Sequence, residues 1–407
     1  MENTSVSDKE YAFNRKLFLF SLIVSNFAAG ALPLLVSLLL IDIGDTFNTS
    51  VGVTGQVNTT YSVAAVIFAL LMGAFSVRFK HKSLLLTGLL LISVSALGCF
   101  FAFNFPIMLA SYTLSGFGFV MISPMAITMV GEHFSLERRA SAVGWVIAGG
   151  ALVYFAGAPL IALAANIGGW RFAILAFVMP VSLVSLALAA TGLQSTKVRR
   201  NQSPPHLHGY LRDFGEVLSN RSAFSCFVGD FFRSASFVAI LLFAASFGRQ
   251  RFSHSRDLTS IVILTAALCF TVGSLICGSM VGRLGRKNST VLSIFLGGAL
   301  TVAYVFAPND LLYVALLFTA CWFFGVGTAS AYSLSLEQVP NLRGTMMSID
   351  SAAINLGGAF GTAVAGLALA FSGYECLNVA LGAMGIVSAF VFKFFSKDPT
   401  GKVAHGV

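Results

Sequence analysis

Charge is scarce in this chain. Charged residues make up 10% of its 407 residues, whereas hydrophobic residues make up 57%. An ordinary soluble domain carries about 25% charged residues. The shortage excludes a molecule whose surface faces water over most of its area, because helices that are apolar on all sides are buried or lie in lipid. The sequence therefore predicts an all-α membrane protein.

The residue patterns that most enzymes need are also missing. None of the six histidines lies inside a long apolar run, and the six cysteines form no CxxC pair. The sequence has no metal-ligand cluster, no Gly-Lys-Ser/Thr loop to cradle a phosphate and no Ser-His-Asp candidate. We expect no enzymatic activity, no metal and no cofactor, and an ion gradient rather than ATP as the energy source.

The net charge of +9 is compatible with nucleic-acid binding. The positive charges, however, are confined to short loops between apolar runs, with no aromatic-basic groove to hold a nucleic acid. We therefore expect no nucleic-acid partner.

Long apolar runs dominate what is present. About 20 apolar residues span a bilayer, and twelve runs of this kind can be counted. They cover residues 17–41, 56–77, 84–103, 107–131, 140–165, 171–192, 223–247, 259–281, 289–307, 311–336, 345–371 and 376–395. With the N-terminus inside, the inner segments hold 20 of the 25 Lys and Arg residues, and the outer loops hold four. Since basic residues favour cytoplasmic loops, we expect a multi-pass protein of the cell membrane with both termini in the cytoplasm.

The polar segments divide the chain. We expect a cytoplasmic tail over 1–16, a six-helix half over 17–192, a cytoplasmic linker over 193–222, a second six-helix half over 223–395 and a tail over 396–407. In the linker, Leu207, Leu211, Phe214 and Leu218 recur at helical spacing. This pattern predicts a short amphipathic helix on the inner membrane face; an ordinary loop is the alternative.

A basic turn occurs twice. It runs from Gly73 to Lys82 and again from Gly278 to Lys287, with the two glycines 205 residues apart. Two arginines, Arg139 and Arg343, are 204 residues apart, and each opens a Gly-rich apolar run. Equivalent positions at a nearly constant offset indicate two pseudo-symmetric halves, related by an axis along the membrane normal.

These features together resemble the major facilitator superfamily. The segment from Gly278 to Lys287 is similar to the family's loop motif Gly-x-x-x-Asp-Arg-x-Gly-Arg-Arg/Lys, with Gly282 at the Asp position; Val77 holds that position in the first copy. The sequences Gly169-Trp170-Arg171-Phe172 and Gly157-Ala158-Pro159 resemble the drug/metabolite:proton antiporter branch.

The resemblance implies twelve spans and a secondary transporter that works by alternating access. It also implies proton-coupled efflux of small amphipathic organic compounds. In span four, Tyr112 stands where the family often has an arginine implicated in proton coupling. If this protein is proton-coupled, that route is not available to it.

Two charges fall inside the seventh apolar run. Asp230 lies roughly 10 Å and Arg233 roughly 15 Å from its start at 1.5 Å per residue, on one helix face. A charge at this depth generally faces a wet cavity or has a partner. Asp230 and Arg233 are therefore our proton-coupling candidates, with a structural ion pair as the alternative. Asn26, 204 residues before Asp230, is a cavity candidate or a helix–helix hydrogen-bonding residue.

A third buried charge, Asp350, lies about two turns into span eleven. The family resemblance implies that it pairs with Arg78 or Lys82 and holds the cytoplasmic side closed; a second proton site is the alternative. Arg283 and Arg286 of the second basic turn complete the expected inner gate.

Other residues are expected to shape the cavity or let helices bend. Phe227, Phe231 and Asn355 are further substrate-cavity candidates. Helix bending is expected at Pro33, Gly149, Gly157 and Pro159, since proline removes a backbone hydrogen bond and small residues let helices approach.

Three functions stay open from the sequence. The first is a proton-linked exporter of small amphipathic compounds. The second is uptake or exchange of an organic anion bound through Arg233, and the third is a non-transporting membrane scaffold or sensor. The expected partners are the lipid bilayer, a small-molecule substrate and protons, with the chain working as a monomer.

Overall fold

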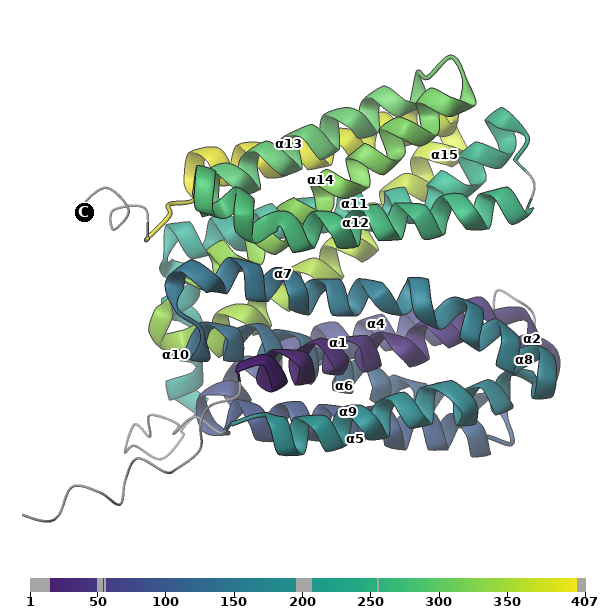
Figure 1. Cartoon of the computed structure of the whole chain (residues 1–407), viewed down its shortest axis with the longest axis horizontal. Helices are drawn as coiled ribbons and strands as arrows, with labels where there is room; N and C mark the ends of the chain where they lie inside the picture. The colour runs from purple at the N-terminus through teal and green to yellow at the C-terminus, as the bar shows by residue number, and fades with distance from the viewer. Residues whose placement is uncertain (1–14, 50–53, 55, 195–206, 255, 401–407) are drawn as a thin grey trace, which may run out of the picture.

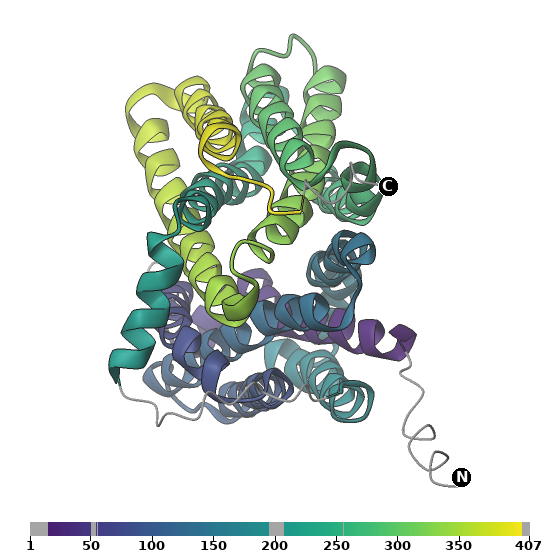
Figure 2. The ribbon, with the colours of Figure 1, turned by 90° about the vertical axis from the view of Figure 1, so that its left-hand side faces the viewer.

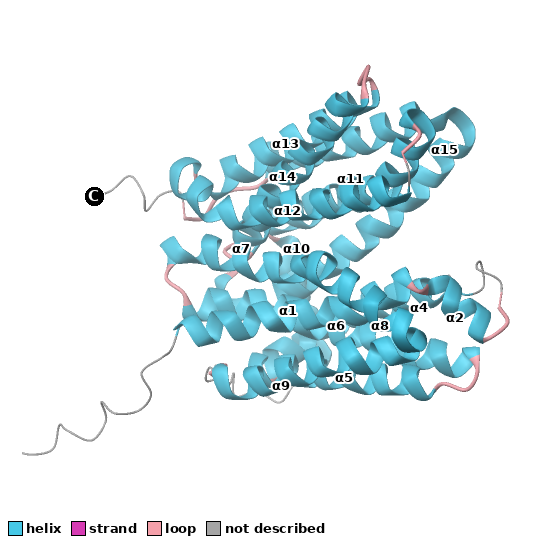
Figure 3. Ribbon diagram, turned by 45° about the vertical axis from the view of Figure 1, so that its right-hand side comes forward, coloured by secondary structure: helices cyan, strands magenta, loops and turns pink. Residues whose placement is uncertain are grey.

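The computed structural model describes residues 15–49, 54, 56–194, 207–254 and 256–400. All regular structure in these ranges is helical, and Figure 3 shows helices joined by short loops. The expected tail over 1–16 and the first part of the expected linker lie almost entirely outside the described residues.

Within the described residues, the N-terminal half contains ten helical elements. They are α1 (Arg15–Leu38), α2 (Leu40–Thr46), α4 (Gln56–Arg78), α5 (His81–Phe101), α6 (Phe105–His133), α7 (Leu136–Leu152), the π-helical turn η1 (Val153–Gly157), α8 (Ala158–Ala173), the π-helical turn η2 (Ile174–Val178) and α9 (Met179–Gly192).

The linker helix and the C-terminal half follow. They are α10 (Leu207–Ser219), α11 (Arg221–Phe252), α12 (Arg256–Leu284), α13 (Arg286–Val305), α14 (Asp310–Ser335), the 3₁₀ turn η3 (Pro340–Leu342) and α15 (Arg343–Phe395).

Together these helices make twelve membrane crossings. By length and composition, ten segments of the described chain qualify as spans, and one of them, Leu136–Gly192, is 57 residues long. That segment contains two spans, because its helix breaks at Gly168 and Gly169, where Gly169 has φ 76°. The helix α11, with 32 residues, provides the twelfth. A similar break at Gly373, with φ 73°, separates spans eleven and twelve within α15. The predicted all-α architecture of twelve spans in two halves is confirmed.

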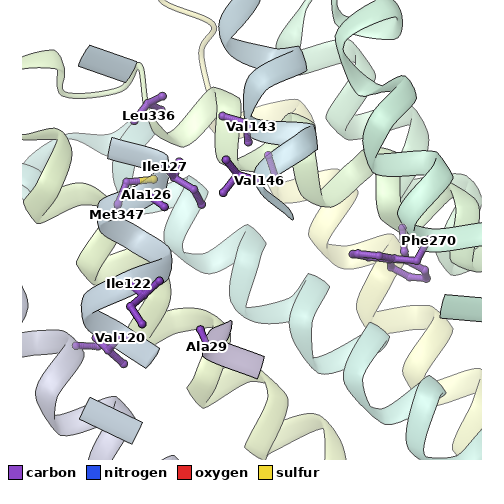
Figure 4. Packing of buried hydrophobic residues seen from close by; sticks show 14 of the residues in the cluster. Ala29, Val120, Ile122, Ala126, Ile127, Val143, Val146, Phe270, Leu336 and Met347 are labelled. Carbon is purple, nitrogen blue, oxygen red and sulfur yellow. The ribbon is translucent and has the colours of Figure 1, made fainter. Parts of the chain in front are cut away.

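The two halves lie one above the other in Figure 1, with the purple to blue-teal helices of the N-terminal half below and the teal to yellow helices of the C-terminal half above. A continuous apolar core crosses the boundary between them. Ala126 and Ile127 of α6 lie beside Leu336 and Met347 of the C-terminal half (Figure 4). The fold is therefore one packed body rather than two separate bundles.

One end of the molecule carries α10 and both basic turns, and we call it the linker end (Figure 2). There the halves meet through very small residues. A Cβ added at Gly144 of α7 would lie 2.1 Å from the carbonyl oxygen of Ser274 in α12, and one at Gly278 would lie 2.6 Å from Cβ of Ser141. The hydroxyl of Thr345 in α15 donates to the carbonyl of Gly73 in α4 at 3.2 Å. The linker end is thus closed in this structure.

The linker helix α10 lies across the linker end, in contact with α11, α15 and α4. Val217 is buried against the core, and Phe214 and Leu218 pack beside it. A helix with an apolar face agrees with the predicted amphipathic segment; the side chains of Leu207 and Leu211 lie outside the described residues.

We predict that Gly144→Ala opens the linker end, because the added methyl group cannot fit against the Ser274 carbonyl and overpacking costs about 1–3 kcal/mol. Spin labels on Arg138→Cys and Leu284→Cys, in a chain with Cys376→Ser, report the distance between the halves by double electron–electron resonance. Gly282→Ala is the matched control, since a Cβ at Gly282 meets nothing within 4 Å. An unchanged distance in Gly144→Ala contradicts the prediction.

Candidate functional site

A buried polar cluster lies within the C-terminal half, where α11, α14 and α15 meet. Glycines bring two of these helices together. A Cβ at Gly357 would lie 2.1 Å from the carbonyl oxygen of Phe231, and one at Gly361 would lie 2.1 Å from that of Ala235. Only a residue without a side chain permits this approach of α15 to α11. The close contact places residues of α15 beside the charges of α11.

Asp230 and Arg233 form an ion pair one turn apart on α11. The Nε of Arg233 donates to Oδ1 of Asp230 at 2.5 Å, and both side chains are buried, with exposed fractions of 3% and 1%. Nη1 of Arg233 donates to the hydroxyl of Thr328 on α14 at 2.8 Å. The guanidinium carbon also lies 5.9 Å from the centre of the Tyr332 ring. The carboxylate, the hydroxyl and the aromatic ring each favour a charged guanidinium and offset the cost of its burial.

Asp350 of α15 is the third charge of the cluster. Its side chain is fully buried and lies next to Asp230, with electrostatic interactions to Asp230 and Arg233. Neither carboxylate oxygen of Asp350 accepts a hydrogen bond. Oδ2 of Asp230 and Nη2 of Arg233 also lack a hydrogen-bond partner. One guanidinium therefore faces two carboxylates. A single proton held between the two acids neutralises the cluster and gives the unsatisfied oxygens a donor.

The expected pairing of Asp350 with Arg78 or Lys82 is not formed in this conformation. Lys82 instead donates to the carbonyls of Ala190 and Leu193 at 2.7 Å each, which ties α5 to the end of α9 within one half. Arg78 is exposed, and its guanidinium lies 5.6 Å from the centre of the Phe79 ring. Asp350 lies beside Asp230 instead, because the glycines of α15 determine how that helix is rotated against α11. The position of Asp350 along the sequence gives its depth in the membrane but not this rotation.

The ionic contact between the halves involves Glu337, just after α14. Its carboxylate accepts from Arg139 of the N-terminal half at 2.6 Å and from Arg343 at 3.2 Å. The two arginines that mark the internal repeat thus share one acid. No role for Glu337 was predicted from the sequence. The acidic turn before each arginine is the signal from which the contact could have been found.

Of the second basic turn, Arg286 is the residue that bridges the halves. It donates to the carbonyl of Leu136 at 2.8 Å, to the Ser333 hydroxyl at 3.0 Å and to Thr400 at 2.5 Å. Arg283 is exposed at the end of α12. Arg286 therefore holds the start of α13 against the start of α7.

His81 occupies the position in the first turn that Arg286 occupies in the second. Its Nδ1 lies 2.8 Å from Oε1 of Glu132, and its Nε2 lies 3.1 Å from the carbonyl oxygen of Ser76. Both neighbours are acceptors, so both contacts are hydrogen bonds only when both ring nitrogens carry protons. A Cβ at Gly344 would lie 3.0 Å from this Nε2, which shows that the ring lies directly beneath the start of α15.

The four expected cavity residues, two asparagines and two phenylalanines, have different surroundings. Asn26 is buried in α1, and its Nδ2 has no hydrogen-bond partner, so it keeps a free donor. Asn355 donates instead to the Ser351 carbonyl of its own helix at 2.8 Å. Phe231 is half-buried, with its ring centre 5.3 Å from that of Phe360 on α15, whereas Phe227 stacks on Phe224 at 6.0 Å.

The expected bending positions coincide with irregular helix geometry in span five. The π-helical turn η1 ends at Gly157, and Pro159 is the second residue of α8, which follows. Gly149, one turn before η1, packs against the backbone of Ile23 in α1. Pro33 lies inside α1, which ends at Leu38. Prolines and π-bulges are the usual causes of kinks.

Comparison with known proteins agrees with this architecture. The family model described as Major Facilitator Superfamily matches residues 18–255 and 223–406, and the chain belongs to this family. It is 22% identical over 388 residues to the uncharacterized MFS-type transporter YwfA of Bacillus subtilis (strain 168), covering 95% of this chain and 93% of the relative. It is 24% identical over 348 residues to Multidrug resistance protein 2 of the same organism, covering 77% and 79% of the two chains.

Among solved structures, the fold resembles the transporter FucP in the outward conformation. The TM-score is 0.80 at 13% identity, and the match covers 95% of this chain and all of FucP. The chain is therefore a multi-pass membrane transporter and not an enzyme.

We predict that Glu337→Gln weakens linker-end closure by about 2–3 kcal/mol, because hydrogen bonds to charged groups are lost on both arginines. The spin-label pair described above should show a larger share of long distances. Glu137→Gln removes an exposed carboxylate from the nearby first turn of α7 and should leave the distances unchanged. Equal behaviour of the two variants contradicts the assignment.

Proposed function

We propose that this protein is a proton-coupled exporter of small amphipathic organic compounds. The observation that carries the proposal is the cluster of Asp230, Arg233 and Asp350, in which two buried carboxylates face one guanidinium. Such a site is neutral with one proton and carries one negative charge without it. A carrier that exchanges protons for substrate needs a group that is neutral in one step and charged in another.

The coupling follows from the cost of burial. A charge near the centre of the membrane costs at least about 2.5–3.5 kcal/mol, so the closed cluster holds its proton. When the halves move and water reaches the cluster, the proton leaves, and a cationic or strongly polarised substrate balances the remaining negative charge. Proton and substrate then compete for one site, which is the requirement for exchange. Similarity to a protein named Multidrug resistance protein 2 is consistent with export.

The proposal includes an orientation. We place the linker end in the cytoplasm and the protein in the cell membrane, with both termini cytoplasmic, because 20 of the 25 Lys and Arg residues lie on that side. In this orientation, the closed linker end shuts the cluster off from the cytoplasm. A single chain contains the whole cluster, so a monomer suffices.

An organic anion is the second candidate substrate. Nη2 of Arg233 has no hydrogen-bond partner and is a donor that a carboxylate could use. Binding of an anion would require both acids to be protonated, because an ionised Asp230 already occupies the guanidinium. This alternative predicts movement of proton and anion in the same direction.

We predict that Asp350→Asn abolishes proton-driven accumulation in vesicles with an imposed pH gradient, because the cluster stays neutral throughout the cycle. Rhodamine 6G serves as the cationic probe and benzoate as the anionic one. Asp230→Asn should also lose accumulation, since Arg233 then pairs with Asp350 and fixes it in the ionised form. Exchange of probe down its own gradient should persist in both variants.

Asp42→Asn is the matched control, because Asp42 is an exposed carboxylate of α2. Undiminished accumulation by Asp350→Asn and Asp230→Asn, with the pH dependence of the unmodified chain, would show that the cluster is a structural ion pair. Accumulation of benzoate in place of rhodamine 6G, lost in Arg233→Gln, favours the second candidate.

A further inference from the structure

A pocket at the linker end lies between the start of α11 and the end of α15. Its lining residues are Asn220, Arg221, Ser222, Phe394, Phe395 and Lys397. Two of these are basic and none is acidic. The pocket is separate from the buried cluster and plays no part in the transport mechanism proposed above.

The polar backbone around the pocket is held by an internal network. The Ser222 hydroxyl donates to Oε1 of Gln338 at 2.6 Å and accepts from the backbone N–H of Lys397 at 2.7 Å. Nε2 of Gln338 donates to the Lys397 carbonyl at 3.0 Å. This network fixes the backbone positions of the residues that carry the two basic side chains. The pocket is therefore built from fixed parts rather than from loose termini.

The two cations are left without acidic partners. Within the described part of the chain, neither Arg221 nor Lys397 forms an ion pair, and both are exposed. Asp398, the acid next to Lys397 in the sequence, accepts from the backbone N–H of Thr400 at 3.0 Å and from its hydroxyl at 2.6 Å. The pocket thus presents two positive charges to whatever enters it.

The apolar side of the pocket places it at the membrane surface. Phe394 and Phe395 are each 66% exposed, and Phe390, one turn earlier, is 48% exposed. Phe390 stacks on Phe394 with ring centres 6.0 Å apart. In a membrane-spanning helix, such a face is covered by acyl chains. The face ends where Lys397 begins the polar tail, and this is the depth at which lipid headgroups lie.

We propose that this pocket binds the phosphate headgroup of an anionic phospholipid. Arg221 offers a planar fork of donors to the phosphate, and Lys397 supplies a second positive charge from the other side. The acyl chains follow the aromatic face formed by Phe390 and Phe394. Gln338, which belongs to the network, directly follows Glu337 in the chain. An occupied pocket therefore stabilises the segment whose Glu337 forms the ionic contact between the halves.

The test compares lipid retention by the purified full-length chain, measured by native mass spectrometry. The probes are phosphatidylglycerol, phosphatidylcholine and inorganic phosphate. We expect phosphatidylglycerol to be retained over phosphatidylcholine. The variant Arg221→Gln/Lys397→Gln should lower its affinity about tenfold or more, as expected for two lost contacts with an anionic lipid. The charge-keeping variant Arg221→Lys/Lys397→Arg should restore most of it, which separates loss of charge from loss of folding.

The matched control is Lys80→Gln/Arg138→Gln, which removes the same charge from exposed positions at the same end. An equal loss in this control overturns the proposal, because general surface charge would then explain the retention. Displacement of phosphatidylglycerol by millimolar inorganic phosphate overturns it as well, because the site would then bind a free anion. Retention unchanged in Arg221→Gln/Lys397→Gln excludes the pocket.

Discussion

The need to neutralise Arg233 inside a medium of low dielectric constant is the constraint on which the C-terminal half depends. A guanidinium at this depth is tolerable only with a partner within hydrogen-bond distance. Asp230 supplies that partner one turn away, and Thr328 of α14 satisfies a second donor. Because Asp230 already neutralises Arg233, Asp350 adds a second carboxylate that charge neutrality does not require. In the proposed function, this excess carboxylate, rather than the ion pair itself, is the group that carries the proton.

The two halves repeat the same helical fold, but in the described part of the chain only the C-terminal half carries the buried charges. At an offset of 204 residues, Asp230, Arg233 and Asp350 correspond to Asn26, Ala29 and Val146. The N-terminal half thus keeps a polar amide at one position and has apolar residues at the other two. It needs no buried counter-charges and can pack as a plain apolar bundle. Two halves with the same fold therefore have different chemistry.

Much of this structure could be predicted from sequence because lipid imposes a simple rule on composition. Apolar runs identified the spans, and the i, i+3 spacing identified the Asp230–Arg233 pair. The neighbour of Asp350 could not be derived, because the rotation of α15 depends on where its backbone meets α11. Glu337 was overlooked as a gate residue for a related reason: a loop acid looks solvated until the opposite half is placed beside it. The periodicity of a sequence gives a residue's depth in the membrane and the helix face on which it lies. Which side chains pair between distant helices depends on how those helices pack.

The seam between α7 and α12 consists of backbone and very small side chains, including Gly144, Gly278 and Ser141. Surfaces of this kind separate without unlocking interdigitated side chains. Along this seam, packing offers little resistance to separation, and the ion pairs around Glu337 add to what the apolar core between the halves supplies. Those pairs are partly accessible to solvent, so dissolved ions screen them. The ionic strength on the linker side thus becomes a kinetic variable for this protein, and the rate of opening rises with salt concentration while the packing inside each half stays unaffected.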